Sequence, residues 1–537
     1  MSGRVVVVGS GASGVHFAAK LLDKGYRVLM LDVGRSRSEP VNPTDDLNGL
    51  KKNLEDPAAY FLGRKYEALI LPDHGSEYYG FPPHKQYIFL ESPEFRFGAK
   101  GFSPLVSFAA GGLAEAWTGG SYPFNDEELA AFPFGYADIE PFYSEVARRI
   151  GITGTADDLG RFFPLHGGLL DPLDLDEHSG LLLESYRKRS SRLNSKLRCY
   201  LGRARVATLS RELAGRPGCT YCGRCLWGCP SDSLYTPSVT LRQCRTHPNF
   251  EYVDQVYVSH LRLDGNGRAK SVVTHSTTDG AVREFDAESV ALAAGTLCSS
   301  KIFLDTVYRD TGKVLALKGL MDNRQILMPF VNLKLVGRRF EPRTYQYHQL
   351  AIGLEGGSAM EYVHGLVTTL KTAMIHPVVQ TLPFDLGTSV NVFRRLHAAL
   401  GLVNANFSDY RREDNFLTLE PEQGSQRTRL AIRYAPEPGE PAKLKAARKT
   451  FQQFLWKLGC IAPTAMAHVR PMGASVHYAG TIPMTDTAAP LTTDRFCRSR
   501  DVENLYFVDG TTFPALPAKN LTLTLMANAT RVASCAF

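Results

Sequence analysis

The stretch RVVVVGSGASGVHFAAKLLDKGYRVLMLD, residues 4–32, decides the fold of the N-terminal part of the chain. Residues 4–8 begin with Arg4 and continue as an unbroken run of four valines, of the kind found in buried parallel strands. A G-x-G-x-x-G turn follows, and apolar residues at helical spacing then lead to a second strand that ends on Asp32. The turn alone would be weak evidence, but strand, turn, helix, strand and acid in this order predict a dinucleotide-binding unit.

The side chains of this unit match the needs of a nucleotide. Glycines allow backbone N–H groups to approach a pyrophosphate, and the start of the helix adds its dipole. A carboxylate at the end of the second strand can accept hydrogen bonds from ribose hydroxyls, which favours FAD or NAD over NADP. We therefore predict cofactor contacts at Gly9, Gly11, Ser13, Gly14 and Asp32.

Composition limits the class of protein. A chain of 537 residues is long enough for two or three domains, and 44% hydrophobic with 21% charged residues is typical of a globular protein. The sequence contains no run of 18 apolar residues, so it predicts no membrane-spanning helix. The net charge of +7 is distributed along the chain, and no cluster of basic residues suggests a nucleic-acid-binding surface. The N-terminus lacks the pattern of a secretory signal, so we expect a cytoplasmic protein in which disulfides are rare.

Motifs further along the chain carry a family resemblance. They are SFAAGGLAEAWTGG (107–120), a strand that ends at Gly295 before a helix, HYAGT (477–481), NLYFVDGTTFP (504–514) and AKNLTLTLMANATRVA (518–533). Together with residues 4–32 they resemble the glucose–methanol–choline (GMC) family of flavin-dependent oxidoreductases. The pattern is most similar to the pyranose oxidase and sugar dehydrogenase members.

The resemblance implies an α/β fold with a Rossmann-like FAD-binding domain and an inserted substrate domain that contains an antiparallel sheet. We expect the FAD-binding domain at 1–165, 200–310 and 456–537, the substrate domain at 311–455, and a connecting segment at 166–199. Alternating segments such as LMPFVNLKL and NFLTLEP within residues 325–420 independently favour an antiparallel sheet.

The resemblance also implies a reaction. Members of the family oxidise a CH–OH group to a carbonyl by passing hydride to flavin N5, here on a sugar, a polyol or another secondary alcohol. Histidine suits the accompanying proton transfer because its pKa lies near working pH. The matching positions make His477 the general base and Asn520 its partner on the substrate oxygen, with His468 as the rival base. A flavin lyase or decarboxylase, and an electron-transfer module for a partner, are the alternative functions.

Further FAD contacts follow from the matching motifs. Leu521 departs from the proline that is common after the paired residue. Ala116 stands where related pyranose oxidases carry the histidine that bonds covalently to FAD, and alanine cannot form that bond, so we expect non-covalent FAD. The expected contact residues are Gly111, Gly112, Trp117, Val256, Gly295, Asp509, Gly510 and Thr522.

The stretch CTYCGRCLWGCP, residues 219–230, has the C-x2-C-x2-C-x3-C-P spacing of a ferredoxin cluster site. Thiolates at this spacing can bind one iron–sulfur cluster or zinc, and the same residues can also be free thiols or a disulfide in a structural loop. In some related sugar dehydrogenases a three-iron cluster passes electrons from FAD to a cytochrome, so a cytochrome or other acceptor protein is an expected partner. The four candidate ligands are Cys219, Cys222, Cys225 and Cys229.

Charged residues are sparse between residues 353 and 407. Two interpretations fit this stretch. One is a buried lining of the substrate domain, and the other is an exposed amphipathic surface that meets a membrane.

Overall fold

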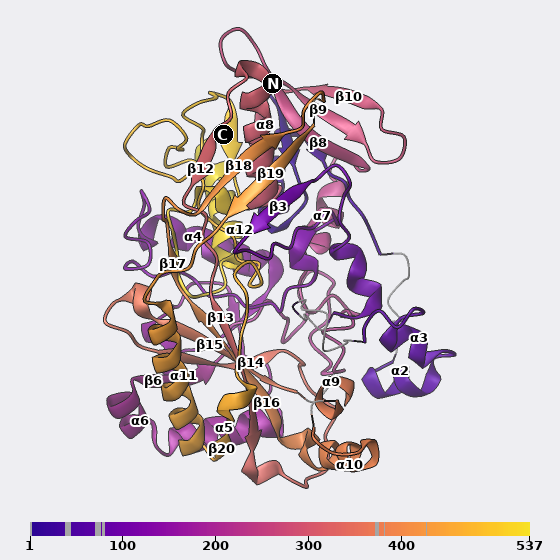
Figure 1. Ribbon diagram of the computed structural model, residues 1–537, viewed down its shortest axis with the longest axis vertical. Helices are drawn as coiled ribbons and strands as arrows, with labels where there is room; N and C mark the ends of the chain where they lie inside the picture. The colour runs from indigo at the N-terminus through magenta and orange to yellow at the C-terminus, as the bar shows by residue number, and fades with distance from the viewer. Residues whose placement is uncertain are drawn as a thin grey trace.

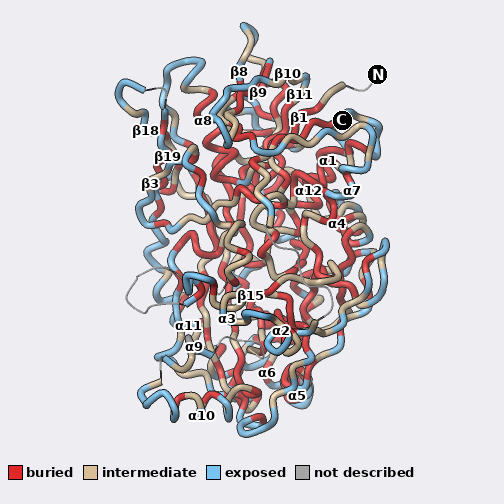
Figure 2. The backbone as a smooth tube through the Cα atoms, turned by 90° about the vertical axis from the view of Figure 1, so that its right-hand side faces the viewer, coloured by how far each residue is buried: buried red, intermediate tan, exposed pale blue. Residues whose placement is uncertain are grey.

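The computed structural model describes residues 3–37, 45–69, 77, 81–370, 375–380, 382–425 and 427–537. It has the mixed α/β architecture that the sequence predicts, with a parallel sheet in one half and a large antiparallel sheet in the other (Figure 1). Buried segments run through both halves beneath an exposed outer layer (Figure 2). Within the described residues, no helix is both long enough and apolar enough to cross a membrane.

The parallel sheet has the strand order β22-β11-β1-β2-β7, and every neighbouring pair is parallel. Val5 and Val7 face a core shared with the helices on one side, while Val6 and Val8 face the core on the other side. Both faces are covered, which explains the continuous apolar run of the first strand. The strands are β1 (Arg4–Val8), β2 (Arg27–Leu31), β7 (Phe250–Val253), β11 (Ser289–Leu292) and β22 (Leu505–Phe507), and the helices are α1 (Ala12–Asp23), α4 (Tyr136–Ile150), α7 (Pro237–Arg245) and α12 (Thr522–Cys535).

The second core of this half lies between the parallel sheet, one helix and two smaller sheets. Leu417, Leu430 and Phe303 contribute to it together with Val6. The helix is α8 (Thr296–Thr311), and the sheets are β10-β9-β8 (Val282–Asp286, Ala269–Ser276, Val256–Leu263) and β12-β18-β19-β3 (Ala316–Lys318, Phe416–Pro421, Thr428–Arg433, Phe97–Lys100).

The other half is built on a seven-stranded antiparallel sheet in the order β20-β13-β16-β15-β14-β6, with β21 also paired to β13. Ile326 and Val403 face a core covered by helices, whereas Leu327 and Asn404 face a cavity on the other side of the sheet. The strands are β6 (Cys199–Arg203), β13 (Gln325–Asn332), β14 (His348–Leu354), β15 (Val363–Thr369), β16 (Leu400–Phe407), β20 (Cys460–Ile461) and β21 (His468–Val469), and the helices are α5 (Glu177–Arg187), α6 (Ser190–Leu197) and α11 (Glu440–Lys457).

Strand pairing crosses the domain limits expected from the sequence. β6 pairs with β14, and β19, from the expected substrate domain, pairs with β3 in the nucleotide half. The limits themselves remain a prediction. The other elements are α2 (Leu47–Asn53), α3 (Pro57–Leu62), α9 (Ile375–Val379), α10 (Leu386–Leu396) and the strand pairs β4–β5 (Ile152–Thr153, Leu169–Leu170) and β17–β23 (Asp409–Tyr410, Ala515–Leu516).

Two helical glycines give a matched test of packing at the nucleotide turn. A Cβ on Gly14 would lie 2.1 Å from the carbonyl oxygen of Gly9, whereas a Cβ on Gly180 of α5 meets nothing within 4 Å. We expect Gly14→Ala to lower the free energy of unfolding by about 1–3 kcal/mol, because the turn must shift to relieve the overlap. Gly180→Ala is expected to raise it by up to about 1 kcal/mol. Thermal denaturation of both variants measures the difference, and an unchanged Gly14→Ala protein would contradict the close packing.

Candidate active site

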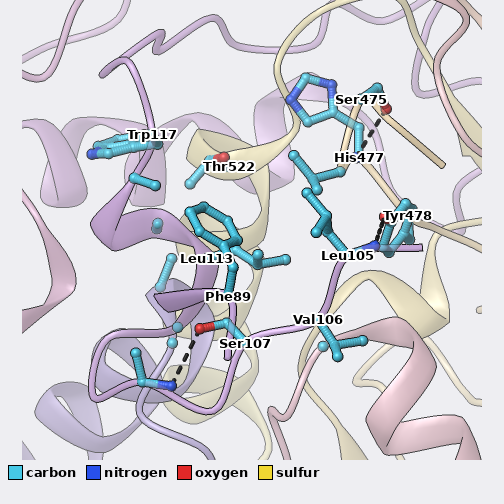
Figure 3. Close-up of a pocket in the computed structure, with 18 of the residues that line it drawn as sticks. Phe89, Leu105, Val106, Ser107, Leu113, Trp117, Ser475, His477, Tyr478 and Thr522 are labelled. Carbon is cyan, nitrogen blue, oxygen red and sulfur yellow. Dashed lines mark hydrogen bonds between the residues drawn. The ribbon is translucent and has the colours of Figure 1, made fainter. Parts of the chain in front are cut away.

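A cavity of about 700 Å³ lies between the two halves of the molecule. One end is lined by the nucleotide turn and the other by the antiparallel sheet, and His477 and Trp117 project toward it from opposite sides (Figure 3). It therefore joins the predicted nucleotide site to the predicted catalytic histidine. The predicted site residues in its lining are Gly9, Gly11, Ser13, Asp32, Gly112, Trp117, Val256, Gly295, His477, Asp509, Gly510, Asn520 and Thr522. Gly14 and Gly111 lie outside the lining but contact it, because Gly14 packs against Gly9 and the N–H of Gly111 donates to Ser10.

The nucleotide turn has the geometry that a pyrophosphate requires. Gly9 has a φ of +97°, which favours glycine, and a Cβ there would lie 2.8 Å from the carbonyl oxygen of Ala293. Gly11 caps α1 without any side-chain hydrogen bond, and the first turn of the helix carries no acidic residue. The uncapped N–H groups of α1 therefore face the cavity as a site for negative charge.

Asp32 stands at the predicted ribose position. Its carboxylate accepts hydrogen bonds from the backbone N–H of Ser10 at 3.1 Å and of Gly34 at 3.2 Å, and from the Ser10 hydroxyl. Burial raises the pKa of Asp32 to about 6. The Ser10 hydroxyl also accepts from the N–H of Gly111 at 2.9 Å, so it links this carboxylate to the glycine pair at 111–112.

Two further segments complete the expected flavin contacts. Asp509 accepts from the N–H of Gly295 at 2.9 Å and from the Ser299 hydroxyl at 2.5 Å, which joins the end of β22 to the start of α8. Helix α12 begins at Thr522 with no side-chain cap, and Thr522 lines the cavity. Its first N–H groups can therefore stabilise negative charge on a planar ring bound there.

The predicted catalytic pair comes together in the cavity. The Nδ2 atom of Asn520 lies 3.4 Å from Nε2 of His477, and Nδ1 of His477 lies 3.0 Å from Oδ1 of Asn323. The rival base His468 is exposed, pairs with Glu77 and does not line the cavity. Asn323 cannot be recognised from the sequence, because it belongs to no motif and lies 154 positions before His477.

The hydrogen bonds of Asn323 determine which ring nitrogen of His477 carries the proton. The Asn323 amide nitrogen donates to the carbonyl oxygens of Phe407 at 2.7 Å and Pro517 at 3.0 Å, which fixes its Oδ1 toward His477. An oxygen in that position accepts from Nδ1–H, so Nε2 keeps its lone pair. Burial, and secondarily the charge of Arg470, lower the pKa of His477 to about 4. The imidazole is then neutral near pH 7, with a proton acceptor aimed into the cavity.

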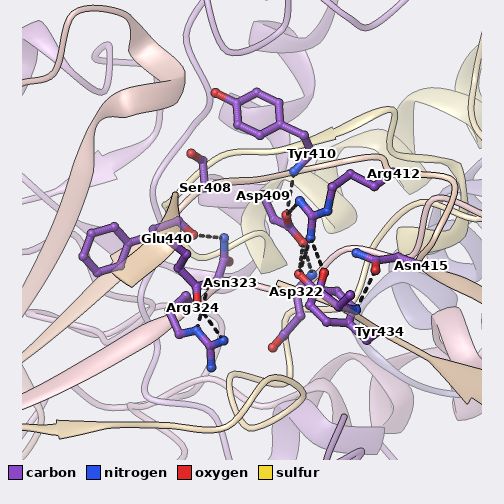
Figure 4. Close-up of polar contacts among 12 residues, drawn as sticks. Asp322, Asn323, Arg324, Ser408, Asp409, Tyr410, Arg412, Asn415, Tyr434 and Glu440 are labelled. Carbon is purple, nitrogen blue, oxygen red and sulfur yellow. Dashed lines mark hydrogen bonds and ion pairs between the residues drawn. The ribbon is translucent and has the colours of Figure 1, made fainter. Parts of the chain in front are cut away.

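Two buried networks hold this pair. Asp322 accepts from the Gly473 N–H at 2.6 Å and from the Ser475 hydroxyl. Its own N–H donates to Asp409 at 3.0 Å (Figure 4). These contacts fix the loop that carries His477.

Lys519 precedes Asn520 and is fully buried with Glu128. Its Nζ atom also donates to the Pro123 carbonyl oxygen at 3.1 Å. Removing one partner of such a buried, hydrogen-bonded ion pair strongly destabilises a folded protein. The pair therefore holds Lys519, and with it the backbone of the adjacent Asn520, in place.

The cysteine loop lies beside this cavity. Leu226 lines the cavity, and its N–H donates to the Gln346 side chain at 2.7 Å. Cys225 is buried, and mutual proximity of the four thiols contributes to raising its pKa, after burial. In the part of the chain that the structure describes, however, no group of three or more His, Cys, Asp or Glu side chains is placed to hold a metal ion.

The fold and this site define a dinucleotide-binding protein with a histidine–asparagine pair at the far end of its cofactor cavity. Residues 411–529 match the family model described as GMC oxidoreductase, the family that the motifs of the sequence resemble.

Two curated relatives differ in how much of the chain they cover. Paromamine 6'-oxidase of Streptomyces fradiae is 24% identical over 98% of this chain and 90% of that protein. The fructose dehydrogenase large subunit of Gluconobacter japonicus is 22% identical over 44% of this chain and 42% of that protein. Among solved structures, pyridoxine 4-oxidase from Mesorbium loti superposes with a TM-score of 0.59 at 16% sequence identity. The superposition covers 99% of this chain and 98% of that one, so it supports the assignment of the fold.

The lowered pKa of His477 has a kinetic consequence. We expect kcat/KM for alcohol oxidation to be constant near neutral pH and to fall in acid with a midpoint of about 4, because the protonated imidazole cannot accept a proton. Steady-state rates between pH 3.5 and 8 measure the profile. A midpoint near the ordinary histidine pKa of about 6.5 would contradict the environment described for Nε2.

Proposed function

We propose that the protein is an FAD-dependent oxidoreductase that oxidises the CH–OH group of a small alcohol to a carbonyl. The observation that carries the proposal is the 3.4 Å pair of His477 Nε2 and Asn520 Nδ2 in the same cavity as the nucleotide turn. FAD, when bound, supplies the acceptor for the hydride. We propose that it binds without a covalent bond, because Ala116, which lines the cavity, has no side chain able to form one.

The residues of the chain divide the remaining work. His477 holds the hydroxyl proton of the substrate at Nε2 as the C–H bond breaks, and Asn323 stabilises the resulting imidazolium by accepting from Nδ1–H. Asn520 donates from Nδ2 toward the same place, so it can orient the reacting oxygen and stabilise its negative charge. The apolar lining, including Leu327 and Leu402, limits the access of water to this end.

The substrate end of the cavity favours a neutral molecule. Among the described lining residues, the only carboxylates are Asp32 and Asp509, and both belong to the nucleotide end. Arg470, at the substrate end, donates to Glu77 at 2.6 Å. With no carboxylate in this lining to pair with an ammonium group, a sugar or polyol without positive charge is the proposed substrate class.

Replacing His477 tests the oxidation directly. We expect His477→Ala to slow anaerobic flavin reduction by alcohol about 10²–10⁴-fold, the usual contribution of a general base, while FAD content is unchanged. His468→Ala, at an exposed histidine outside the cavity, is the matched control and should retain the wild-type rate. Undiminished flavin reduction in His477→Ala would contradict the proposal. Conversion of a substrate without flavin reduction in the wild type would favour a lyase instead.

The cysteine loop, residues 219–230, takes part in no step of the proposed alcohol oxidation. The four thiols do not form a ligand set among the described residues, so the cluster and a cytochrome partner remain predictions from the resemblance. Iron and acid-labile sulfide analysis of protein purified without oxygen tests the cluster. Three or four irons with matching sulfide would show that the loop binds a cluster and would make an electron-transfer role the stronger alternative.

A further inference from the structure

Several buried polar atoms of residues that line the cavity, Oδ1 of Asn404 among them, have no hydrogen-bond partner among the described residues. Two of these atoms, Nε2 of His348 and Oδ1 of Asn520, both lie beside Gly120. A buried polar atom without a partner costs about 1–3 kcal/mol. Such atoms in a cavity indicate that a ligand or water supplies the missing hydrogen bond.

The two atoms converge on one point. The position that a Cβ on Gly120 would occupy lies 3.0 Å from Asn520 Oδ1 and 3.2 Å from His348 Nε2. Gly120 also lines the cavity, and its φ is not in the left-handed region, so its backbone does not require glycine. The absence of a side chain at residue 120 therefore leaves space between the two atoms that an alanine methyl group would enter.

The supporting strands hold His348 in this position. It is the first residue of β14 and pairs with Thr368 of β15, and a register irregularity separates it from Leu350. Burial lowers the pKa of His348 to about 4, so the imidazole is neutral near pH 7. A neutral ring nitrogen can donate or accept, depending on the tautomer.

The Asn520 amide relates this point to the reaction centre. Its Nδ2 atom faces His477, where the proposed reacting oxygen lies, and its Oδ1 atom faces the space beside Gly120. A single planar amide can therefore hydrogen-bond to two neighbouring oxygens of one ligand. A hydroxyl group suits the second position because it can donate to Oδ1 and accept from Nε2–H at the same time.

We propose that His348 and Asn520 form a subsite for a second hydroxyl group, on the carbon next to the one that is oxidised, so that the substrate is a vicinal diol or polyol. This inference rests on the proposed alcohol oxidation and specifies its substrate class. His348 acts in it as a specificity-determining residue that contacts the hydroxyl that does not react.

A matched pair of ligands tests the subsite in the wild-type holoenzyme. trans-1,2-Cyclohexanediol and cyclohexanol share a ring and differ by one hydroxyl. Two additional hydrogen bonds at about 1 kcal/mol each predict at least tenfold higher kcat/KM for the diol, and a similarly lower dissociation constant by calorimetry. Equal binding of the two ligands, with water filling the space, would overturn the subsite.

Variants assign the effect to the two residues. We expect His348→Leu and Gly120→Ala each to reduce the diol-to-cyclohexanol ratio of kcat/KM about tenfold, and His348→Gln, which keeps a donor and an acceptor, to restore part of it. Gly265→Ala, where a Cβ meets nothing within 4 Å, is the matched glycine control. FAD content and melting temperature monitor folding. A ratio unchanged in both His348→Leu and Gly120→Ala would overturn the assignment.

The calorimetric comparison separates the two proposals. If no alcohol reduces the flavin, the oxidation proposal fails, while preferential binding of the diol still supports the subsite. If alcohols reduce the flavin but the diol has no advantage, the oxidation proposal stands and the subsite fails.

Discussion

The hydrogen bond between Asn323 Oδ1 and His477 Nδ1 determines what the rest of the site can do. Two backbone carbonyl oxygens fix the Asn323 amide, the amide fixes the imidazole tautomer, and the tautomer leaves Nε2 free to accept a proton. With Asn323 turned the other way, His477 would present an N–H to the substrate and could not take its proton. The buried networks around Asp322 and Lys519 hold the segments that carry His477 and Asn520.

The two halves of the molecule divide recognition from chemistry. The parallel sheet presents a turn of close-packed glycines and an uncapped helix, which suit a large anionic cofactor. The antiparallel sheet uses the alternation of its strands to place Ile326 and Val403 in a helix-covered core and Leu327 and Asn404 in the cavity. His477 and Asn520 come from loops between these halves, so a substrate bound beside them also faces the cofactor end.

Local patterns predicted the first nucleotide unit, because strand, turn, helix and acid are contiguous and each has its own signal at residues 4–32. His477 and Asn520 could be named only through motifs that resemble a family. Asn323, His348 and Gly120 could not be named, because each is an ordinary residue whose role depends on contacts made by distant segments. The cysteine run remains a prediction, because its spacing suits a metal site but no group of three or more ligand side chains is placed to hold a metal ion among the described residues.

The protonation state of the His477 ring can be measured in solution. ¹⁵N NMR of protein labelled at histidine, with the His477 signals assigned by their loss in His477→Ala, reports which nitrogen carries hydrogen. At pH 7 we expect hydrogen on Nδ1 and none on Nε2, as the contact with Asn323 requires. Hydrogen on Nε2, alone or together with Nδ1, would contradict the role of His477 as the proton acceptor.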